Sequence, residues 1–181
     1  MDLAINQHKQ PFNFNRFANL PENVKEKYVH KESAFSFGWS HGKEQLDGKP
    51  DFSKGSYYNN PTYDKPFDDP KIIAEYPSFA SPNIWPTEDL PELEPAFKDL
   101  GSLVVNVGIL LAVHCDEYVH SKAPSYPRKK LHDIILNCRT TKARLLHYFP
   151  HDSIEPTELK QEQEDDFGSW CGWHNDHVCD V

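Results

Sequence analysis

The sequence has few cysteines and no long uninterrupted apolar run, and each shortage argues against a class of protein. Four cysteines in 181 residues are too few and too scattered for a secreted disulfide scaffold. The longest apolar run, residues 103–113, is short for a bilayer span and is interrupted by Asn106 and Gly108. No basic-then-apolar leader opens the sequence. We therefore expect a cytoplasmic protein in a reducing compartment, with no membrane partner.

Basic residues are also in short supply. Nineteen Lys and Arg oppose 28 Asp and Glu, so the net charge is −9 with histidine neutral, and no basic stripe stands out. Nucleic acid is therefore not an expected partner, because binding its phosphates requires clustered cations.

Residues 1–86 contain most of the rings but little periodicity. Fifteen of the 23 aromatic residues lie within 12–85, interleaved with Pro, Gly, Asn and Asp. A short helix is predicted over 20–31. The rest, including SFGWSHGKEQLDGKPDFSKGSYYNNPTYD, is predicted to be a long loop that its rings hold against a surface, because disordered segments are poor in aromatic residues. We interpret 1–86 as an N-terminal wrapping region.

Residues 87–181 have a different character and are interpreted as a second region. A long amphipathic helix is predicted from Thr87 to about His120, because apolar residues recur at intervals of three, four and seven. The residues of this expected buried face are Leu93, Phe97, Leu100, Val104, Val107, Leu111 and Tyr118. A second helix is predicted over 128–137. Alternation of apolar and polar residues then predicts a strand over 143–149, which ends at Pro150.

Several isolated side chains are given structural roles. His114 and His120 lie on or near the long helix and are expected to serve the fold rather than chemistry. Cys115 and Cys138 lie near apolar helix positions and are expected to be buried packing residues. The acidic stretch 152–166 is expected to be a solvated loop, since like charges repel one another.

The strongest chemical signal is His174-Asn175-Asp176. On an extended segment, side chains two residues apart point to the same side, so the imidazole of His174 and the carboxylate of Asp176 can reach one ion. Such a pair is two thirds of the arrangement of two histidines and one carboxylate that binds non-haem Fe(II). A bare His-x-Asp is common by chance, and the surrounding sequence gives this one its weight.

Two segments, KARLLHYFP at 142–150 and WCGWHNDH at 170–177, resemble the isopenicillin N synthase-like branch of the 2-oxoglutarate/Fe(II)-dependent oxygenases. The stretches FSFGWSHGKE, SYYNNP, NIWP and LPELEPAFKDLG are similar to that family's N-terminal region. The resemblance runs from about Leu20 to His177. It implies an α+β fold with an incomplete double-stranded β-helix (jelly roll), a long supporting helix and a loop-dominated N-terminal region.

The same resemblance implies a function. The chain would be a non-haem iron oxygenase that oxidises a small organic substrate with dioxygen, with His174 and Asp176 as metal ligands and Fe(II) as cofactor. His147 and Tyr148 fall at the family's cosubstrate positions, and the His147 face of the strand, rather than the Arg144 face, is interpreted as the pocket side. Plant relatives usually have Asn-Tyr-Tyr-Pro here, and Phe149 lacks the second tyrosine's hydroxyl. The use of 2-oxoglutarate therefore stays an open alternative.

Family character stops after His177, and the family's distal histidine and Arg-x-Ser are not found before Val181. We therefore expect a truncated product with reduced activity, in which uncovered sheet edges lead to self-association. Two alternatives remain. The chain is a non-catalytic fragment that acts through protein interactions, or its tail forms a structural zinc site. The four candidate zinc ligands are Cys171, His174, His177 and Cys179.

Overall fold

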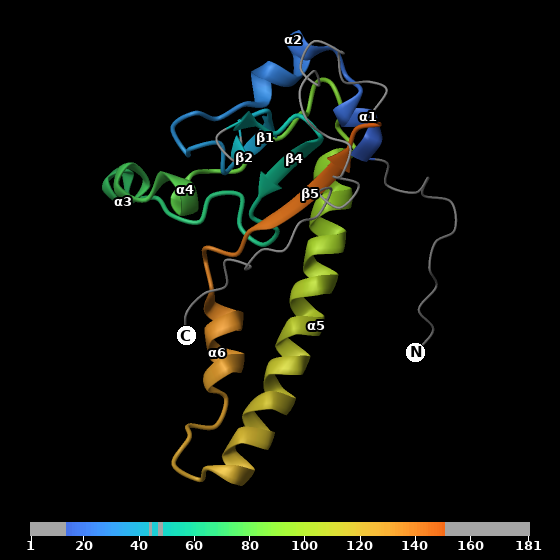
Figure 1. The fold of residues 1–181 in the computed structure, drawn as a ribbon. Coiled ribbons are helices and arrows are strands. Elements are labelled where there is room, and N and C mark those ends of the chain that lie inside the picture. Colours follow the sequence, from blue (N-terminus) through green and yellow to red (C-terminus); the bar gives the residue numbers. More distant parts are fainter. Residues whose placement is uncertain (1–13, 44, 47–48, 151–181) are drawn as a thin grey trace.

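The chain folds into a small antiparallel sheet, short helices along one side of it and one long helix that extends away (Figure 1). The structure is a computed structural model, and it describes residues 14–43, 45–46 and 49–150. The helical elements are α1 (Phe14–Ala18), α2 (Glu22–Lys25), the 3₁₀ turn η1 (Glu26–Tyr28), α3 (Pro70–Glu75), α4 (Pro77–Ala80), α5 (Leu93–Lys122) and α6 (Lys130–Asn137). The strands are β1 (Gly38–His41), β2 (Gln45–Leu46), β3 (Lys49–Pro50), β4 (Lys54–Asn59) and β5 (Ala143–Tyr148). The α+β class is confirmed.

The main sheet has three strands in the order β1-β4-β5, all antiparallel. Its central strand β4 comes from the predicted N-terminal region and its edge strand β5 from the second region, so the two regions share one sheet. β2 and β3 form a separate two-stranded hairpin. Within residues 14–43, 45–46 and 49–150, the strands thus form an open sheet rather than the two facing sheets of a jelly roll.

The expectation of a long loop between residues 36 and 64 is wrong, because this segment supplies β1 and β4. Its periodicity is hidden because both faces of these strands are covered. Trp39 and Tyr57 are buried on one face, while Ser40 and Ser56, at 4% and 1% exposure, are buried on the other. Hydrophobicity alone cannot reveal a strand whose second buried face carries small hydroxyl side chains.

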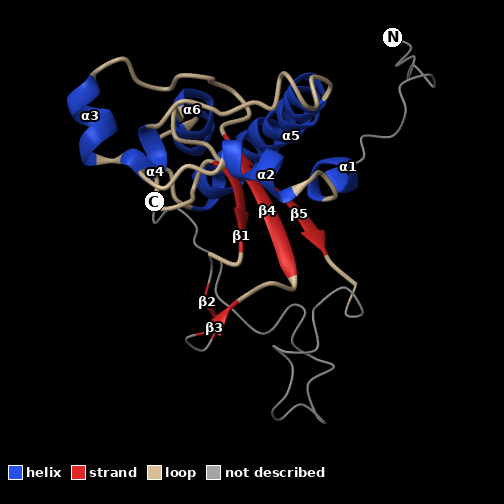
Figure 2. Cartoon of the chain, turned by 90° about the horizontal axis from the view of Figure 1, so that it is seen from above, coloured by secondary structure: helices blue, strands red, loops and turns tan. Residues whose placement is uncertain are grey.

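The rings of the N-terminal region do pack the structure, as predicted. Phe17 lies 4.8 Å from Tyr57 and 5.4 Å from Trp39, measured between ring centroids, and is fully buried. The other members of this core cluster are Phe14, Ala18, Tyr28, Leu90 and Leu93. The helix predicted over 20–31 is shorter, and consists of α2 followed by η1. α1 lies beside β5 and completes the cover of this face of the sheet (Figure 2).

The long helix begins at Leu93 rather than at Thr87. Residues 87–89 form a turn instead, and Pro91, which has no N–H to donate, lies ahead of the first helical residue. The predicted second helix starts two residues late, at Lys130, and the predicted strand is confirmed as Ala143–Tyr148. The positions of these elements were therefore predicted well, and their first residues less well.

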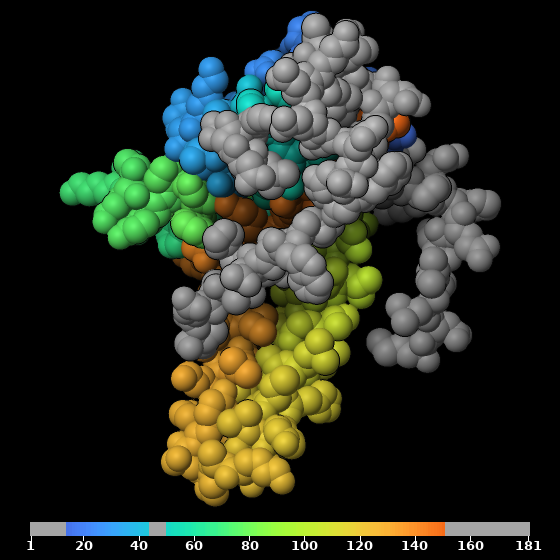
Figure 3. Space-filling model, in the orientation of Figure 1, coloured from blue at the N-terminus to red at the C-terminus, as the bar shows by residue number. Residues whose placement is uncertain are grey.

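The predicted buried face of the long helix is wrong over most of its length. Leu93 and Phe97 join the core, and Gly101 packs on Pro61 with no room for a Cβ atom. Beyond Gly101 the helix leaves the sheet and extends alongside α6 (Figures 1 and 3). Cys115 is exposed there rather than buried, and Cys138 is half-buried. In length and composition α5 would suffice to cross a membrane, a weak criterion that core helices also meet.

Asp116 joins α5 to α6. It is 2% exposed, and its carboxylate accepts the backbone N–H groups of Leu131 and His132, both at 3.0 Å, and the hydroxyl of Tyr126 at 2.9 Å. Burial raises the pKa of Asp116, but these three donors outweigh it, so the pKa lies below its ordinary value. His120 has a structural role, as predicted, because its Nδ1 lies 2.9 Å from the carbonyl oxygen of Tyr126.

Candidate functional site

Two histidines lie in one row across the end of the main sheet. His41 on β1 pairs with Gly55 on β4, and Gly55 pairs with His147 on β5. Directly paired residues of neighbouring strands have their side chains on the same face. The two imidazoles therefore lie on one face of the sheet, separated by a strand whose residue in this row has no side chain.

Gly55 is required at the centre of this row. A Cβ atom built there would collide with the six-membered ring of Trp39, which lies directly over the glycine. Trp39 is 1% exposed, and its Nε1 has no hydrogen-bond partner among the described residues. The buried indole of Trp39 therefore lies against Gly55, between the two histidines, and its N–H remains able to donate a hydrogen bond.

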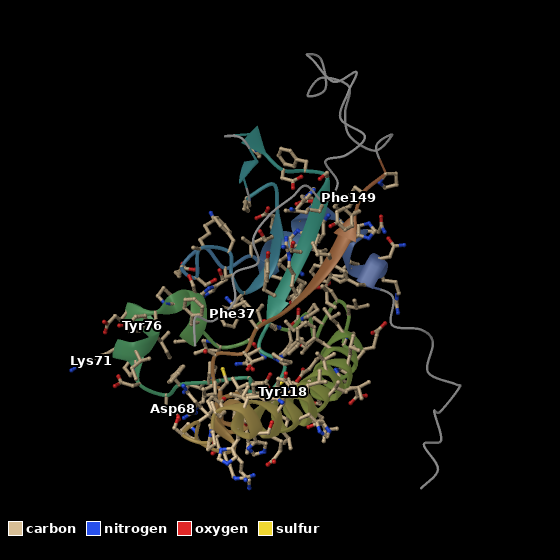
Figure 4. The ribbon with its side chains drawn as sticks, turned by 60° about the horizontal axis from the view of Figure 1, so that its bottom comes forward. Phe37, Asp68, Lys71, Tyr76, Tyr118 and Phe149 are labelled. Carbon is tan, nitrogen blue, oxygen red and sulfur yellow. The ribbon has the colours of Figure 1, made fainter. Side chains whose placement is uncertain are left out.

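Phe149 connects the two imidazoles. The ring centroids of His41 and His147 each lie 4.7 Å from that of Phe149, which follows the end of β5 (Figure 4). The ammonium of Lys25 lies 6.0 Å from the Phe149 ring and 5.4 Å from the Trp39 ring. Lys25 is 6% exposed, donates to the carbonyl oxygen of Ala18 at 3.1 Å and pairs with Glu22 at 2.9 Å. We call His41, His147, Phe149, Lys25 and Trp39 the histidine row.

The electrostatics of the row favour a neutral His147. Burial lowers its pKa below the ordinary value, and the charges of Lys25 and His41 lower it further. A neutral imidazole has one nitrogen lone pair available for a metal or a proton. At His41, Nε2 lies 3.1 Å from the carbonyl oxygen of Phe52, which can only accept, so Nε2 carries a proton.

The opposite face of β5 contacts other parts of the sheet. The guanidinium of Arg144 donates to the hydroxyl of Ser56 from Nε at 3.0 Å and from Nη2 at 2.7 Å, and it lies 5.1 Å from the ring of Tyr58. Tyr148 belongs to this face by strand alternation, whereas His147 faces the row. The two predicted cosubstrate positions therefore lie on opposite faces, and one pocket can use only one of them.

The described residues do not complete a metal site. Within residues 14–43, 45–46 and 49–150, no group of three or more His, Cys, Asp and Glu side chains could hold an ion together. The imidazoles of His41 and His147 are side chains of the type that bind Fe(II). The predicted ligands His174 and Asp176 lie outside the described residues, as do Cys171, His177 and Cys179.

The sequence did not predict His41 as a site residue, because residues 38–41 were not predicted to form a strand. It did not predict Lys25 either, because the predicted helix over 20–31 was not placed against the sheet. The available signal was the alternation of Trp39, Ser40 and His41, followed by Gly55 in a second short segment. The alternation alone does not show which side chains are neighbours, because that depends on the register between the strands.

No protein-family model matches the sequence, and a comparison with curated proteins gives no match either.

Proposed function

We propose that this chain belongs to the non-haem Fe(II)-dependent oxygenases and contributes to the oxidation of a small organic substrate by dioxygen. The supporting observation is that three segments of the family resemblance meet in one sheet. GWSH forms β1, KGSYYN forms β4 and ARLLHY forms β5, although they are far apart in the sequence. The resemblance thus falls on segments that form one structural unit of the chain.

Two further segments of the resemblance support this sheet. Within NIWP, the carbonyl oxygen of Ile84 accepts the hydroxyl of Tyr57 at 2.8 Å and the side-chain amide of Asn59 at 2.7 Å. Within LPELEPAFKDLG, Leu93 and Phe97 pack into the core at the start of α5. The segments that carry the resemblance are therefore in contact with one another in the folded chain.

In this proposal His174 and Asp176 bind Fe(II), and the substrate would lie against the histidine row. The cavity that the described residues form, lined by Ser40 and Tyr58 among others, is on the opposite face of the sheet. Bound iron would supply dioxygen activation. The part of the row is to keep a neutral imidazole at His147 and to exclude water with Phe149 and Trp39. The cosubstrate 2-oxoglutarate is the less favoured variant, because Phe149 offers no hydroxyl to its carboxylate.

The test is anaerobic Fe(II) titration of the full chain, followed by dioxygen consumption in the presence and absence of 2-oxoglutarate. His174→Ala and Asp176→Ala should each weaken iron binding at least about tenfold and abolish iron-dependent dioxygen consumption. The matched control is His177→Ala, which removes a neighbouring imidazole with no assigned iron ligand role and should leave both unchanged. Iron binding that is insensitive to Asp176→Ala would refute the proposal.

The same variants distinguish the proposed iron site from a structural zinc site. A four-ligand zinc site would depend on His177 and Cys179 but not on Asp176. One equivalent of zinc, lost in His177→Ala and Cys179→Ala and kept in Asp176→Ala, would assign the tail to a structural metal site instead.

A further inference from the structure

The exposed surface of α5 contains a continuous apolar stripe. Seven large apolar side chains of this helix are each about half or more exposed, among them Leu110 at 63% and Tyr118 at 67% (Figure 4 labels Tyr118). The members of the stripe are Leu100, Leu103, Val104, Val107, Leu110, Leu111 and Tyr118. Residues 100–115 contain no Asp, Glu, Lys or Arg. An uncharged surface of this extent on a helix is unusual for a monomeric protein and marks an interaction site.

The spacing within the stripe is that of a helix-to-helix contact. Residues 100, 104, 107, 111, 114 and 118 follow one another at intervals of four, three, four, three and four. This is the heptad repeat with two seam positions, and Leu103 and Leu110 flank the seam on one side, seven residues apart. His114 is the polar member of the seam. Any apolar face of a helix has intervals of three and four, and over this length the spacing suits a second helix as the partner.

One face of α5 is already occupied, and it is not the stripe. Asp116 accepts the N–H groups at the start of α6, and Ala112, one turn before it, is also buried. The stripe lies on other residues of α5, and the hairpin of α5 and α6 projects from the rest of the structure (Figures 1 and 3). A second helix can therefore approach the stripe without displacing α6.

The area of the stripe fits a dimer. Seven side chains exposing on the order of 100 Å² each would bury about 700 Å² per copy. Stable protein–protein interfaces bury about 800 Å² per partner. Because a two-fold axis brings identical surfaces together, an uncharged stripe is complementary to itself without the like-charge repulsion that a chain of net charge −9 would otherwise create.

A lipid bilayer fits the same stripe less well. The uncharged segment 100–115 is about 24 Å long at 1.5 Å per residue, shorter than the roughly 30 Å hydrocarbon core. Acidic residues lie at both of its ends, Asp99 and Asp116, whereas surface-binding helices carry Lys and Arg. Insertion would also take the buried carboxylate of Asp116, with the hydrogen bonds that hold α6, to the edge of the bilayer.

From these observations we infer that the stripe on α5 is the contact surface of a homodimer, in which the stripes of two copies pack helix against helix. The inference does not depend on the proposed iron chemistry. It places self-association on the helix rather than on a sheet edge.

The test is sedimentation velocity of the full chain from about 1 to about 100 µM. The wild-type chain should convert from monomer to dimer over this range. Val107→Glu, in the middle of the stripe, should raise the dimer dissociation constant at least about 100-fold, because two uncompensated carboxylates would be buried at the seam. Val107 is 48% exposed in the single chain, so the fold should survive, and far-UV circular dichroism checks this.

The matched control is Ser102→Glu, which adds the same charge to α5 at an exposed position on the side opposite the seam. It should dimerise like wild type. A wild-type chain that stays monomeric at the highest concentration overturns the inference, and so does a dimer that persists in Val107→Glu. Flotation with neutral phosphatidylcholine vesicles that is lost in Val107→Glu, with no dimer in solution, would assign the stripe to a membrane and equally overturn it.

Discussion

The carboxylate of Asp116 on α5 accepts the backbone N–H of Leu131, at 3.0 Å, in the first turn of α6. The two residues are 15 positions apart in the sequence, and their contact holds together the hairpin of α5 and α6, in which much of the apolar surface is exposed. With His132 and Tyr126 as further donors, one buried side chain serves as the cap that α6 lacks in its own sequence, since Lys129 makes no capping hydrogen bond.

Replacing Asp116 with Ala should therefore loosen α6 while the sheet stays folded. The N–H groups of Leu131 and His132 would lose their acceptor, and their amide exchange should accelerate at least about tenfold. The control is Glu117→Ala, which removes only an exposed ion pair with Arg128. Equal exchange at these two amides in wild type and Asp116→Ala would show that the carboxylate does not hold the helix.

Gly55 and Gly108 provide a matched pair of substitutions to alanine. At Gly55 the added methyl group meets the ring of Trp39, so Gly55→Ala should lower the free energy of unfolding by about 1–3 kcal/mol. At Gly108 the same methyl group meets nothing within 4 Å, and alanine should stabilise α5 by about 0.5–1 kcal/mol. Urea unfolding measures both, and the pair contradicts the structure if the two signs are reversed.

The contrast between these glycines also shows what the sequence can and cannot predict. The period of 3.6 residues located α5, and alternation located β5, because each pattern is visible within one segment. The strand through Gly55 stayed hidden, since Ser56 is buried and Gly55 has no side chain to contribute to a pattern. The histidine row depends on the register of three strands, which brings together His41 and His147 from positions 106 residues apart.

The length of the buried face of α5 was overestimated for a related reason. Periodicity tells which residues share a face, but not what lies opposite that face. Leu93 packs in the core cluster and Phe97 on Trp85, whereas Val107 and Leu111 continue the same pattern further along the helix and remain exposed.

Stability should decline on the acid side because of His147. Its pKa is lowered in the folded state, so between that value and the ordinary value near 6.5 the unfolded chain binds more protons. The contribution of neutral His147 to stability is complete above about pH 6.5 and is lost as the pH falls through the folded-state pKa. Melting temperatures measured from pH 8 to pH 5 should fall less steeply in His147→Gln than in wild type. His114→Gln, at an exposed position, is the control, with all chains at about 1 µM so that the proposed dimer is dissociated. Identical slopes in wild type and His147→Gln would contradict the lowered pKa of the half-buried His147.

Phe149→Tyr tests whether the missing hydroxyl decides the cosubstrate. If the row faces the pocket, a tyrosine here adds a donor between His41 and His147, and a hydroxyl-to-carboxylate hydrogen bond contributes about 1.5–3 kcal/mol. Isothermal titration of the Fe(II)-loaded chain with 2-oxoglutarate should then show at least about tenfold tighter binding in Phe149→Tyr than in wild type. Phe79→Tyr is the control, because Phe79 is 55% exposed and lies in α4. Equal affinities in all three chains would mean that the hydroxyl at residue 149 does not contact this cosubstrate, whereas tighter binding in Phe79→Tyr alone would place the carboxylate elsewhere on the chain.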